Sequence, residues 1–295
     1  MTTSSGQNYL AIPGPSVIPD EVLRSMHRAA PNIYEGELIE ITESLIQDLN
    51  YVARSSGKVA MYIANGHGIW EAALSNMVSK GDYILVIATG RFAYGWAEIA
   101  KRMEIKIDIV DFGKNTALDV ETVSEKLLSE PKNKYKAILL TQVDTSTSVK
   151  NDIASLRKKL TEIECLSLLA VDCIASLACD RFEMDKWGVD IMVAACQKGL
   201  MVPPGMGFVF FNHRAEERQR ELKNVSLYWD WEPRVNPSRY YEYFCGTAPT
   251  HHIYGLRTAL DMIKSEEIEK TWKRHEILSQ AIWAAVDRWS LGSDI

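Results

Sequence analysis

Short apolar runs alternate with amphipathic stretches along most of the chain. Runs rich in Val, Ile and Leu predict seven strands, at 58–63, 83–88, 106–111, 136–141, 167–171, 190–194 and 207–211. Helical periodicity predicts helices near 20–29, 36–54, 67–79, 92–103, 119–129, 152–162 and 214–223. Continuous apolar strands that alternate with helices are typical of a parallel sheet covered on both faces. The pattern therefore predicts an α/β fold, with a mostly parallel seven-stranded sheet and helices on both faces.

The last quarter of the chain departs from this alternation. Residues 224–250 are aromatic and turn-rich, which is typical of a long structured segment near a site or a subunit interface. A long helical pattern follows, with a break near Ser265 and an apolar stripe that includes Ile277 and Ile282. Such a stripe needs a cover, and little sequence remains to provide one. We expect a large domain with an N-terminal arm over 1–265, and over 266–295 the start of a small C-terminal α/β domain that is truncated here.

Composition and charge limit the possible functions. The chain has 295 residues, 46% hydrophobic and 24% charged, which is typical of a globular protein. A formal charge of -6 provides no basic surface for nucleic acid or an anionic membrane. The N-terminus lacks the features of a secretory signal, and no apolar run approaches the roughly 20 residues of a membrane span. Five cysteines without metal or CxxC spacing indicate reduced thiols. We expect a soluble, cytoplasmic protein that acts on small molecules.

Two polar residues follow neighbouring apolar strands. Asp172 ends the strand at 167–171, and Lys198 follows the strand at 190–194. Ligands bind at this carboxyl edge of open α/β sheets. A lysine and an acid suit pyridoxal phosphate (PLP), because the lysine can form a Schiff base and the acid can keep the pyridine nitrogen protonated. A buried structural ion pair is the alternative, and these two residues alone leave both interpretations open.

Two other segments offer polar groups at the same edge. In NGHGIWEAAL (65–74), small and polar residues precede an apolar helix, whose first-turn N–H groups can hold a phosphate or simply be capped. DTSTSVKN (144–151) follows another strand and supplies hydroxyl groups. The pair His251-His252 lacks an acidic or Cys partner at helical spacing, so we expect no metal site.

Several longer strings identify a family when they are taken together. They are Pro13-Gly14-Pro15, GHGIWEAAL, ATGRFAYGW, DTSTSV, VDCIASL, WGVDIMVAACQKGLMVPPGMGFV and TAPTHHIYGLRTAL. The most specific is QKGLMVPPGMGF with its upstream Asp. From residue 12 to its end, the chain resembles the class-V aminotransferases of PLP fold type I. The likeness is to the alanine–glyoxylate and serine–glyoxylate (serine–pyruvate) aminotransferases in particular, with pyridoxamine–pyruvate aminotransferase as a near relative.

The resemblance implies a role for each matching residue. Lys198 would form the Schiff base and then move the substrate proton, and Asp172 would pair with the pyridine nitrogen. Phe92 and Ile174 would contact the two faces of the ring, and Thr145 would lie near its 3′ oxygen. The residues implied for the phosphate are Asn65, Gly66, His67 and Gln197.

Two further residues match positions with roles outside the cofactor ring. Thr247 matches a residue that the family lends across a homodimer to the neighbour's phosphate, which implies active sites shared between subunits. Gly14 matches a loop that lines the substrate pocket. The arginine that grips the substrate carboxylate in these enzymes is expected beyond residue 295.

The resemblance implies transamination between a small amino acid, alanine or serine, and a small 2-oxo acid, glyoxylate or pyruvate. Three alternatives stay open. The chain can be a pyridoxamine–pyruvate aminotransferase, a PLP-dependent lyase such as a cysteine desulfurase, or a truncated PLP-binding remnant without turnover.

Overall fold

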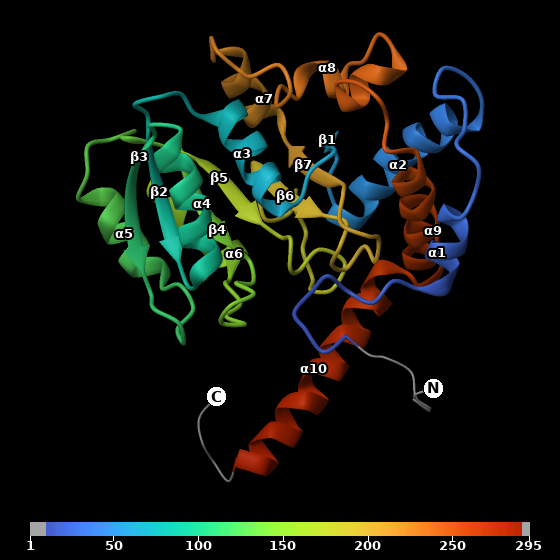
Figure 1. The fold of residues 1–295 in the computed structure, drawn as a ribbon. Helices are drawn as coiled ribbons and strands as arrows, with labels where there is room; N and C mark the ends of the chain where they lie inside the picture. Colours follow the sequence, from blue (N-terminus) through green and yellow to red (C-terminus); the bar gives the residue numbers. More distant parts are fainter. Residues whose placement is uncertain (1–9, 291–295) are drawn as a thin grey trace.

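A seven-stranded sheet forms the centre of the computed structural model, which describes residues 10–290 (Figure 1). The strand order is β1-β7-β6-β5-β4-β2-β3. Strand β7 runs antiparallel to both of its neighbours, and all other pairs are parallel. The strands are β1 (Lys58–Tyr62), β2 (Tyr83–Ala88), β3 (Lys106–Asp111), β4 (Tyr135–Thr141), β5 (Leu168–Asp172), β6 (Ile191–Ala195) and β7 (Gly207–Phe211). The expected α/β fold with a mostly parallel seven-stranded sheet is confirmed.

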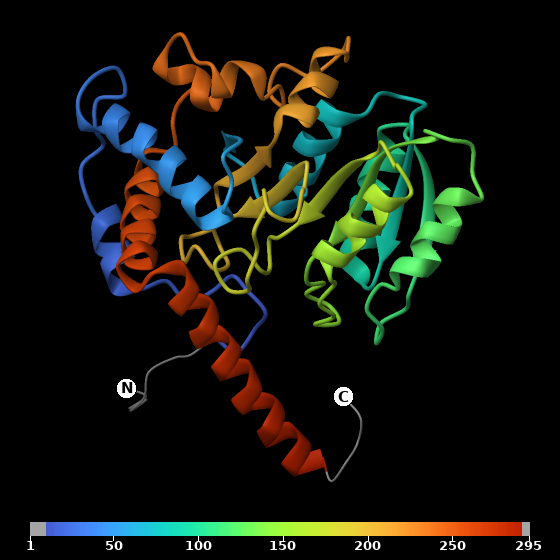
Figure 2. The same ribbon diagram turned by 180° about the vertical axis from the view of Figure 1, so that it is seen from behind.

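Helices cover both faces of this sheet, as expected (Figures 1 and 2). Those of the first three quarters are α1 (Asp20–Met26), α2 (Glu37–Ala53), α3 (Gly66–Met77), α4 (Arg91–Arg102), α5 (Val120–Leu128), α6 (Ile153–Glu162) and α7 (His213–Arg220). They are followed by α8 (Glu232–Val235), the 3-10 helix η1 (Tyr240–Phe244), α9 (Thr250–Glu266) and α10 (Ile268–Ser290).

The core has two halves because successive strand residues point to opposite faces of the sheet. Leu85 and Ile87 of β2 pack into the half formed with α2, α5, α6 and α9. Ile84 and Val86 of the same strand pack into the half formed with α3 and α4. The central strands are buried on both faces, so their sequences are continuously apolar rather than alternating.

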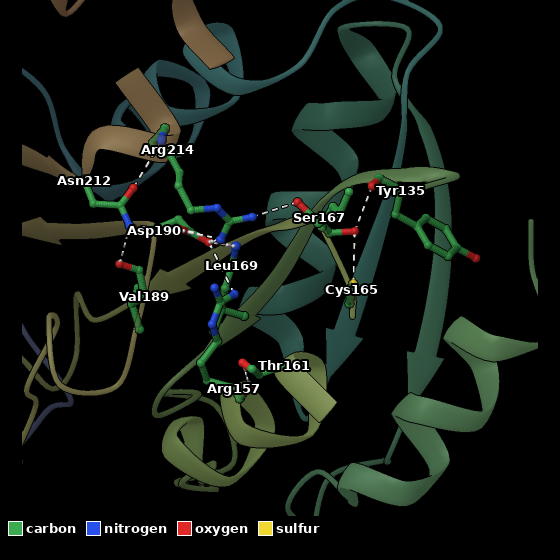
Figure 3. A network of polar contacts seen from close by, with 12 residues as sticks. Tyr135, Arg157, Thr161, Cys165, Ser167, Leu169, Val189, Asp190, Asn212 and Arg214 are labelled. Carbon is green, nitrogen blue, oxygen red and sulfur yellow. Dashed lines mark hydrogen bonds and ion pairs between the residues drawn. The ribbon is translucent and has the colours of Figure 1, made fainter. Parts of the chain in front are cut away.

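A buried acid ties the starts of the two strands that carry the candidate site residues (Figure 3). Asp190, immediately before β6, is fully buried and accepts hydrogen bonds from Arg214 Nη1 at 2.9 Å to each carboxylate oxygen. The backbone N–H of Leu169 in β5 and the side chain of Asn212 before α7 each donate to it at 2.8 Å. This network fixes β5 and β6 at the ends opposite the site, which favours a fixed separation at their carboxyl ends.

The aromatic segment 224–250 is ordered around a buried arginine. Arg234 donates hydrogen bonds to the backbone oxygens of Met61 at 2.8 Å and Tyr228 at 2.6 Å. Its guanidinium lies over the Tyr62 ring, 4.2 Å from the ring centroid. The segment is therefore anchored on β1, just before the start of α3.

Helices α9 and α10 are separated by Glu267, whose φ of 70° ends α9 two residues after the expected break near Ser265. The start of α10 packs against the core through Ile268 and Trp272. The rest of the helix projects away from the body of the molecule (Figures 1 and 2). Ile277 and Ile282 of the expected apolar stripe are 52% and 63% exposed. Within residues 10–290, no helix combines the length and apolar character needed to cross a membrane.

Candidate active site

The carboxyl ends of β4, β5 and β6 and the first turns of α3 and α4 surround a cavity of about 310 Å³. Every expected site residue except Thr247 lines it. The lining residues are Gly14, Pro15, Asn65, Gly66, His67, Trp70, Phe92, Val143, Thr145, Asp172, Ile174, Ala175, Gln197, Lys198 and Pro204. Thr247 is exposed and lies between η1 and α9.

Asp172 is the last residue of β5 and is buried at the base of this cavity. One carboxylate oxygen accepts a hydrogen bond from the Ile174 backbone at 2.7 Å, and the other accepts one from Trp70 Nε1 at 2.9 Å. Burial raises the pKa of Asp172 to about 7, although these two hydrogen bonds act in the opposite direction. The acid therefore lies close to its titration midpoint near neutral pH.

Trp70 is a site residue that the sequence analysis did not single out. Its indole is buried, donates to Asp172, and lies near the rings of Phe92 and His67, at centroid distances of 6.1 and 4.7 Å. A Cβ on Gly95 would come within 3.1 Å of the indole, so this glycine makes room for it. The signal in the sequence was the position of Trp70 one helical turn after the Asn-Gly-His cap, on the face that points into the cavity.

Lys198 follows β6 in a turn that the N-terminal arm covers. Its Nζ donates a hydrogen bond to the Pro13 carbonyl at 2.6 Å, and Ser16 binds the backbone of the turn at 2.9 Å. Burial lowers the pKa of the Lys198 amine, and the charge of Asp172 partly offsets this effect. A Cβ on Gly14, whose φ is 137°, would lie 2.4 Å from Nζ. This φ favours glycine, and a Cβ here would displace the flexible end of the Lys198 side chain.

The first turn of α3 supplies backbone donors to the cavity. Asn65 caps this helix, and its side-chain oxygen accepts from Gly68 N at 3.2 Å. A Cβ on Gly66 would come within 2.7 Å of Ile174 Cδ1, so the backbone here lies directly against the side chain of Ile174, which follows β5. Free N–H groups and the helix dipole make such a turn suitable for an anion. Gln197 faces the same cavity, and its buried side-chain oxygen has no hydrogen-bond partner among the described residues.

A second cavity, of about 470 Å³, adjoins the first one. Gly14, Ala175 and Lys198 line both cavities, so the lysine stands between them. Arg274 and His275 of α10 line the far side of the second cavity. Arg274 is held by Glu266 through two hydrogen bonds, at 2.5 and 2.8 Å. Lys198 is therefore accessible from a space outside the cofactor-sized cavity.

Comparison with known proteins places the chain in a family. The family model described as Aminotransferase class-V matches residues 9–290. The serine–glyoxylate aminotransferase of Arabidopsis thaliana is 32% identical over 287 residues, which cover 97% of this chain and 72% of that protein. The serine–glyoxylate aminotransferase of Methylorubrum extorquens is 32% identical over 298 residues, which cover 98% of this chain and 73% of that one.

Solved structures show the same fold. An alanine–glyoxylate aminotransferase from Nostoc sp. superposes with a TM-score of 0.87 at 22% identity, covering 98% of this chain and 77% of that one. A pyridoxamine–pyruvate aminotransferase from Mesorhizobium loti gives a TM-score of 0.84 at 23% identity, covering 97% and 72%. The chain belongs to the class-V aminotransferases, a family of PLP-dependent enzymes, and the expectation of an aminotransferase of fold type I is confirmed.

Proposed function

We propose that this chain binds PLP in the cavity beside Lys198 and transfers an amino group between a small amino acid and a small 2-oxo acid. Alanine or serine would be the donor, and glyoxylate or pyruvate the acceptor. The observation that carries the proposal is the buried Asp172 carboxylate, which faces the same cavity as the Lys198 amine. The substrates named for the serine–glyoxylate and alanine–glyoxylate relatives support this choice.

The polar groups of the cavity fit PLP. Among the described residues, the hydrogen bonds to Asp172 come from uncharged donors, so a cationic ring nitrogen would supply the missing countercharge. The Gln197 side chain, whose NH₂ group can donate, and the N–H groups in the first turn of α3 suit a phosphate in this cavity. A volume of about 310 Å³ lies at the lower end of the range for small-molecule sites, roughly 300–1,000 Å³.

The chain's own residues divide the chemical work. When bound, PLP supplies an electron sink that stabilises the charge left as the substrate's α-carbon loses its proton. Asp172 holds the proton on the ring nitrogen, because a carboxylate beside that nitrogen favours its cationic form. Lys198 Nζ would provide the covalent attachment, and, once the substrate's amino group has replaced it there, the freed amine would carry the α-carbon proton. Since burial lowers its pKa, more of the amine is in the neutral, basic form near pH 7. Phe92 and Ile174 line this cavity and would contact the two faces of the ring.

We assign the second cavity to the substrate. It gives a small amino acid or 2-oxo acid access to Lys198 without displacing groups from the first cavity. The Gly14 backbone borders both spaces and would contact the substrate. His275 and Arg274 place hydrogen-bonding groups on its far side, although Glu266, which lines the same cavity, already pairs with Arg274.

We further propose a homodimer in which Thr247 of each chain reaches the phosphate in the partner's site. Its exposure and its position outside the cavity of its own chain support this assignment. Sedimentation analysis should give a dimer, and Thr247→Val should weaken PLP binding without changing the mass of the assembly. A monomer that binds PLP as tightly as the dimer would contradict the shared site.

The half-reaction with L-serine tests the proposed activity. We expect the PLP-loaded protein to convert L-serine to hydroxypyruvate in a stoichiometric amount, with loss of the visible absorbance, and glyoxylate to restore that absorbance. The matched control is Lys198→Ala, which should do neither. Release of pyruvate and ammonia from L-serine, or of sulfide from L-cysteine, would instead indicate a lyase. Unchanged absorbance with every amino acid would indicate a PLP-binding protein without turnover.

A further inference from the structure

A second buried acid, Asp144, lies beside the cavity but does not line it. It follows β4 at the start of the hydroxyl-rich loop. One carboxylate oxygen accepts hydrogen bonds from the backbone N–H groups of Phe92 at 2.9 Å and Ala93 at 3.3 Å. The other accepts from Ser146, at 3.0 Å from the backbone and 2.6 Å from the hydroxyl. A single carboxylate therefore joins the start of α4 to the loop after β4.

Asp144 caps the N-terminus of α4 in place of the residue at the N-cap position. Gly90 occupies the N-cap position of α4 and has no side chain that could satisfy the first-turn N–H groups. A Cβ on Gly90 would lie 2.4 Å from the Asp144 carboxyl carbon. Its φ of 169° is ordinary extended backbone, so the close approach to Asp144, and not the backbone conformation, requires glycine here. Ser146 adds a second link, because its hydroxyl accepts from Arg91 N at 2.9 Å.

Other helix caps in the chain act locally. Asp152 caps α6 through hydrogen bonds from Ser155, at 3.0 Å from the backbone and 2.7 Å from the hydroxyl. These bonds nearly repeat the contacts of Asp144 with Ser146, but they join neighbouring residues of a single helix end. Asp144 differs because it also captures Phe92, 52 residues away. Phe92, which donates to Asp144, and Thr145, which follows Asp144 in the chain, both line the cavity.

We propose that Asp144 is a positioning residue that fixes Phe92 and Thr145 relative to each other and so sets the orientation of the bound cofactor ring. The inference rests on the proposed function, in which these two residues hold PLP. Both carboxylate oxygens accept hydrogen bonds only. In Asp144→Asn the side-chain NH₂ group must face one of the two sets of donors, either Phe92 and Ala93 or Ser146. The hydrogen bonds to that set are lost, while the side-chain volume stays the same.

The test compares Asp144→Asn with Asp152→Asn, which makes the same substitution at a similar cap remote from the site. We expect both variants to lower the melting temperature. Only Asp144→Asn should weaken PLP affinity, by roughly tenfold or more, since an unmade hydrogen bond to a charged group has an effect of that order. At saturating PLP it should also reduce the visible circular dichroism of the bound cofactor and lower kcat with little change in KM, which loss of stability alone does not do.

Gly90→Ala provides an independent variant, because its methyl group displaces the same carboxylate without removing it. We expect it to reproduce the changes in dichroism and kcat, and the double variant Gly90→Ala/Asp144→Asn to show less than the sum of the two effects. If Asp144→Asn and Gly90→Ala both have the PLP affinity and dichroism of Asp152→Asn, the positioning role of Asp144 is wrong and the proposed function is unaffected. A wild-type protein that binds no PLP would overturn the proposed function together with this inference.

Discussion

The raised pKa of Asp172 predicts how stability depends on pH in protein from which cofactor has been removed. Burial raises this pKa from 3.8 to about 7 in the folded chain, whereas an unfolded aspartate titrates near 3.9. Because the folded pKa is the higher one, the folded state binds the extra proton between these values. Its stability is then fully present below about pH 4 and falls as the pH rises towards and beyond 7.

The magnitude follows from proton linkage. Between pH 5 and pH 8 the unfolded chain has released the Asp172 proton, while the folded chain releases it only near pH 7. Integration over this interval gives a loss of about 2.5 kcal/mol from the free energy of unfolding. The substitution Asp172→Asn removes this loss, whatever it does to the absolute stability through altered hydrogen bonds with Trp70 and Ile174. Titrating groups that do not interact with Asp172 cancel in the comparison, whereas Lys198, whose pKa the Asp172 charge raises, does not.

Urea unfolding at pH 5 and pH 8, followed by tryptophan fluorescence, measures this difference. We expect the free energy of unfolding of the wild type to fall, relative to that of Asp172→Asn, by about 2.5 kcal/mol over the interval. Asp119→Asn is a control: hydrogen bonds from Thr122 lower the pKa of that exposed acid, so this variant should retain the same loss of stability as the wild type. Parallel pH dependence in wild type and Asp172→Asn would refute the assignment of a raised pKa.

Four further predictions concern turnover, assembly of the site and stability. Asp172→Asn should lower kcat on the order of 10²-fold with PLP still bound, because the ring proton loses its countercharge; a kcat equal to wild type would remove Asp172 from the mechanism. Trp70→Phe should lower kcat by roughly tenfold, since Asp172 loses a hydrogen bond of about 1.5–3 kcal/mol, and Michaelis–Menten kinetics at saturating PLP would show it. Gly14→Ala should weaken PLP attachment to Lys198, because a φ of 137° strains an alanine and its Cβ would displace the end of the Lys198 side chain; absorbance titration with PLP measures this, and unchanged PLP affinity would contradict it. Asp190→Asn should lower the free energy of unfolding by about 3 kcal/mol with little change in PLP affinity, since its network lies at the far end of the strands.

Most of the fold was predictable from local patterns. All seven strands lie within two residues of their expected bounds, because buried parallel strands are continuously apolar and their flanking turns are polar. The break expected near Ser265 also lies close to the observed one at Glu267. Because the ends of β5 and β6 were predicted correctly, the sequence also predicted that Asp172 and Lys198 lie at the same edge of the sheet.

The residues that support the site were not predictable in the same way. The bonds of Trp70 to Asp172 and of Asp144 to Phe92 join positions 102 and 52 residues apart. They depend on the rotation of α3 and α4 about their axes, which periodicity alone fixes too coarsely for a hydrogen bond. Gly90 gave no signal either, because its requirement arises from the carboxylate of a distant loop. The second cavity likewise depends on how α10 crosses the N-terminal arm.

The most direct test of the central claim is to locate the covalent attachment of the cofactor. Purified protein is incubated with PLP, reduced with borohydride, digested and mapped by mass spectrometry. The proposal predicts an absorbance band above roughly 400 nm before reduction and a phosphopyridoxyl label on Lys198 after it, and Lys198→Ala should lose both. A label on a different lysine in the wild type, or no label on folded protein, would contradict the assignment of Lys198 and of the cavity beside it.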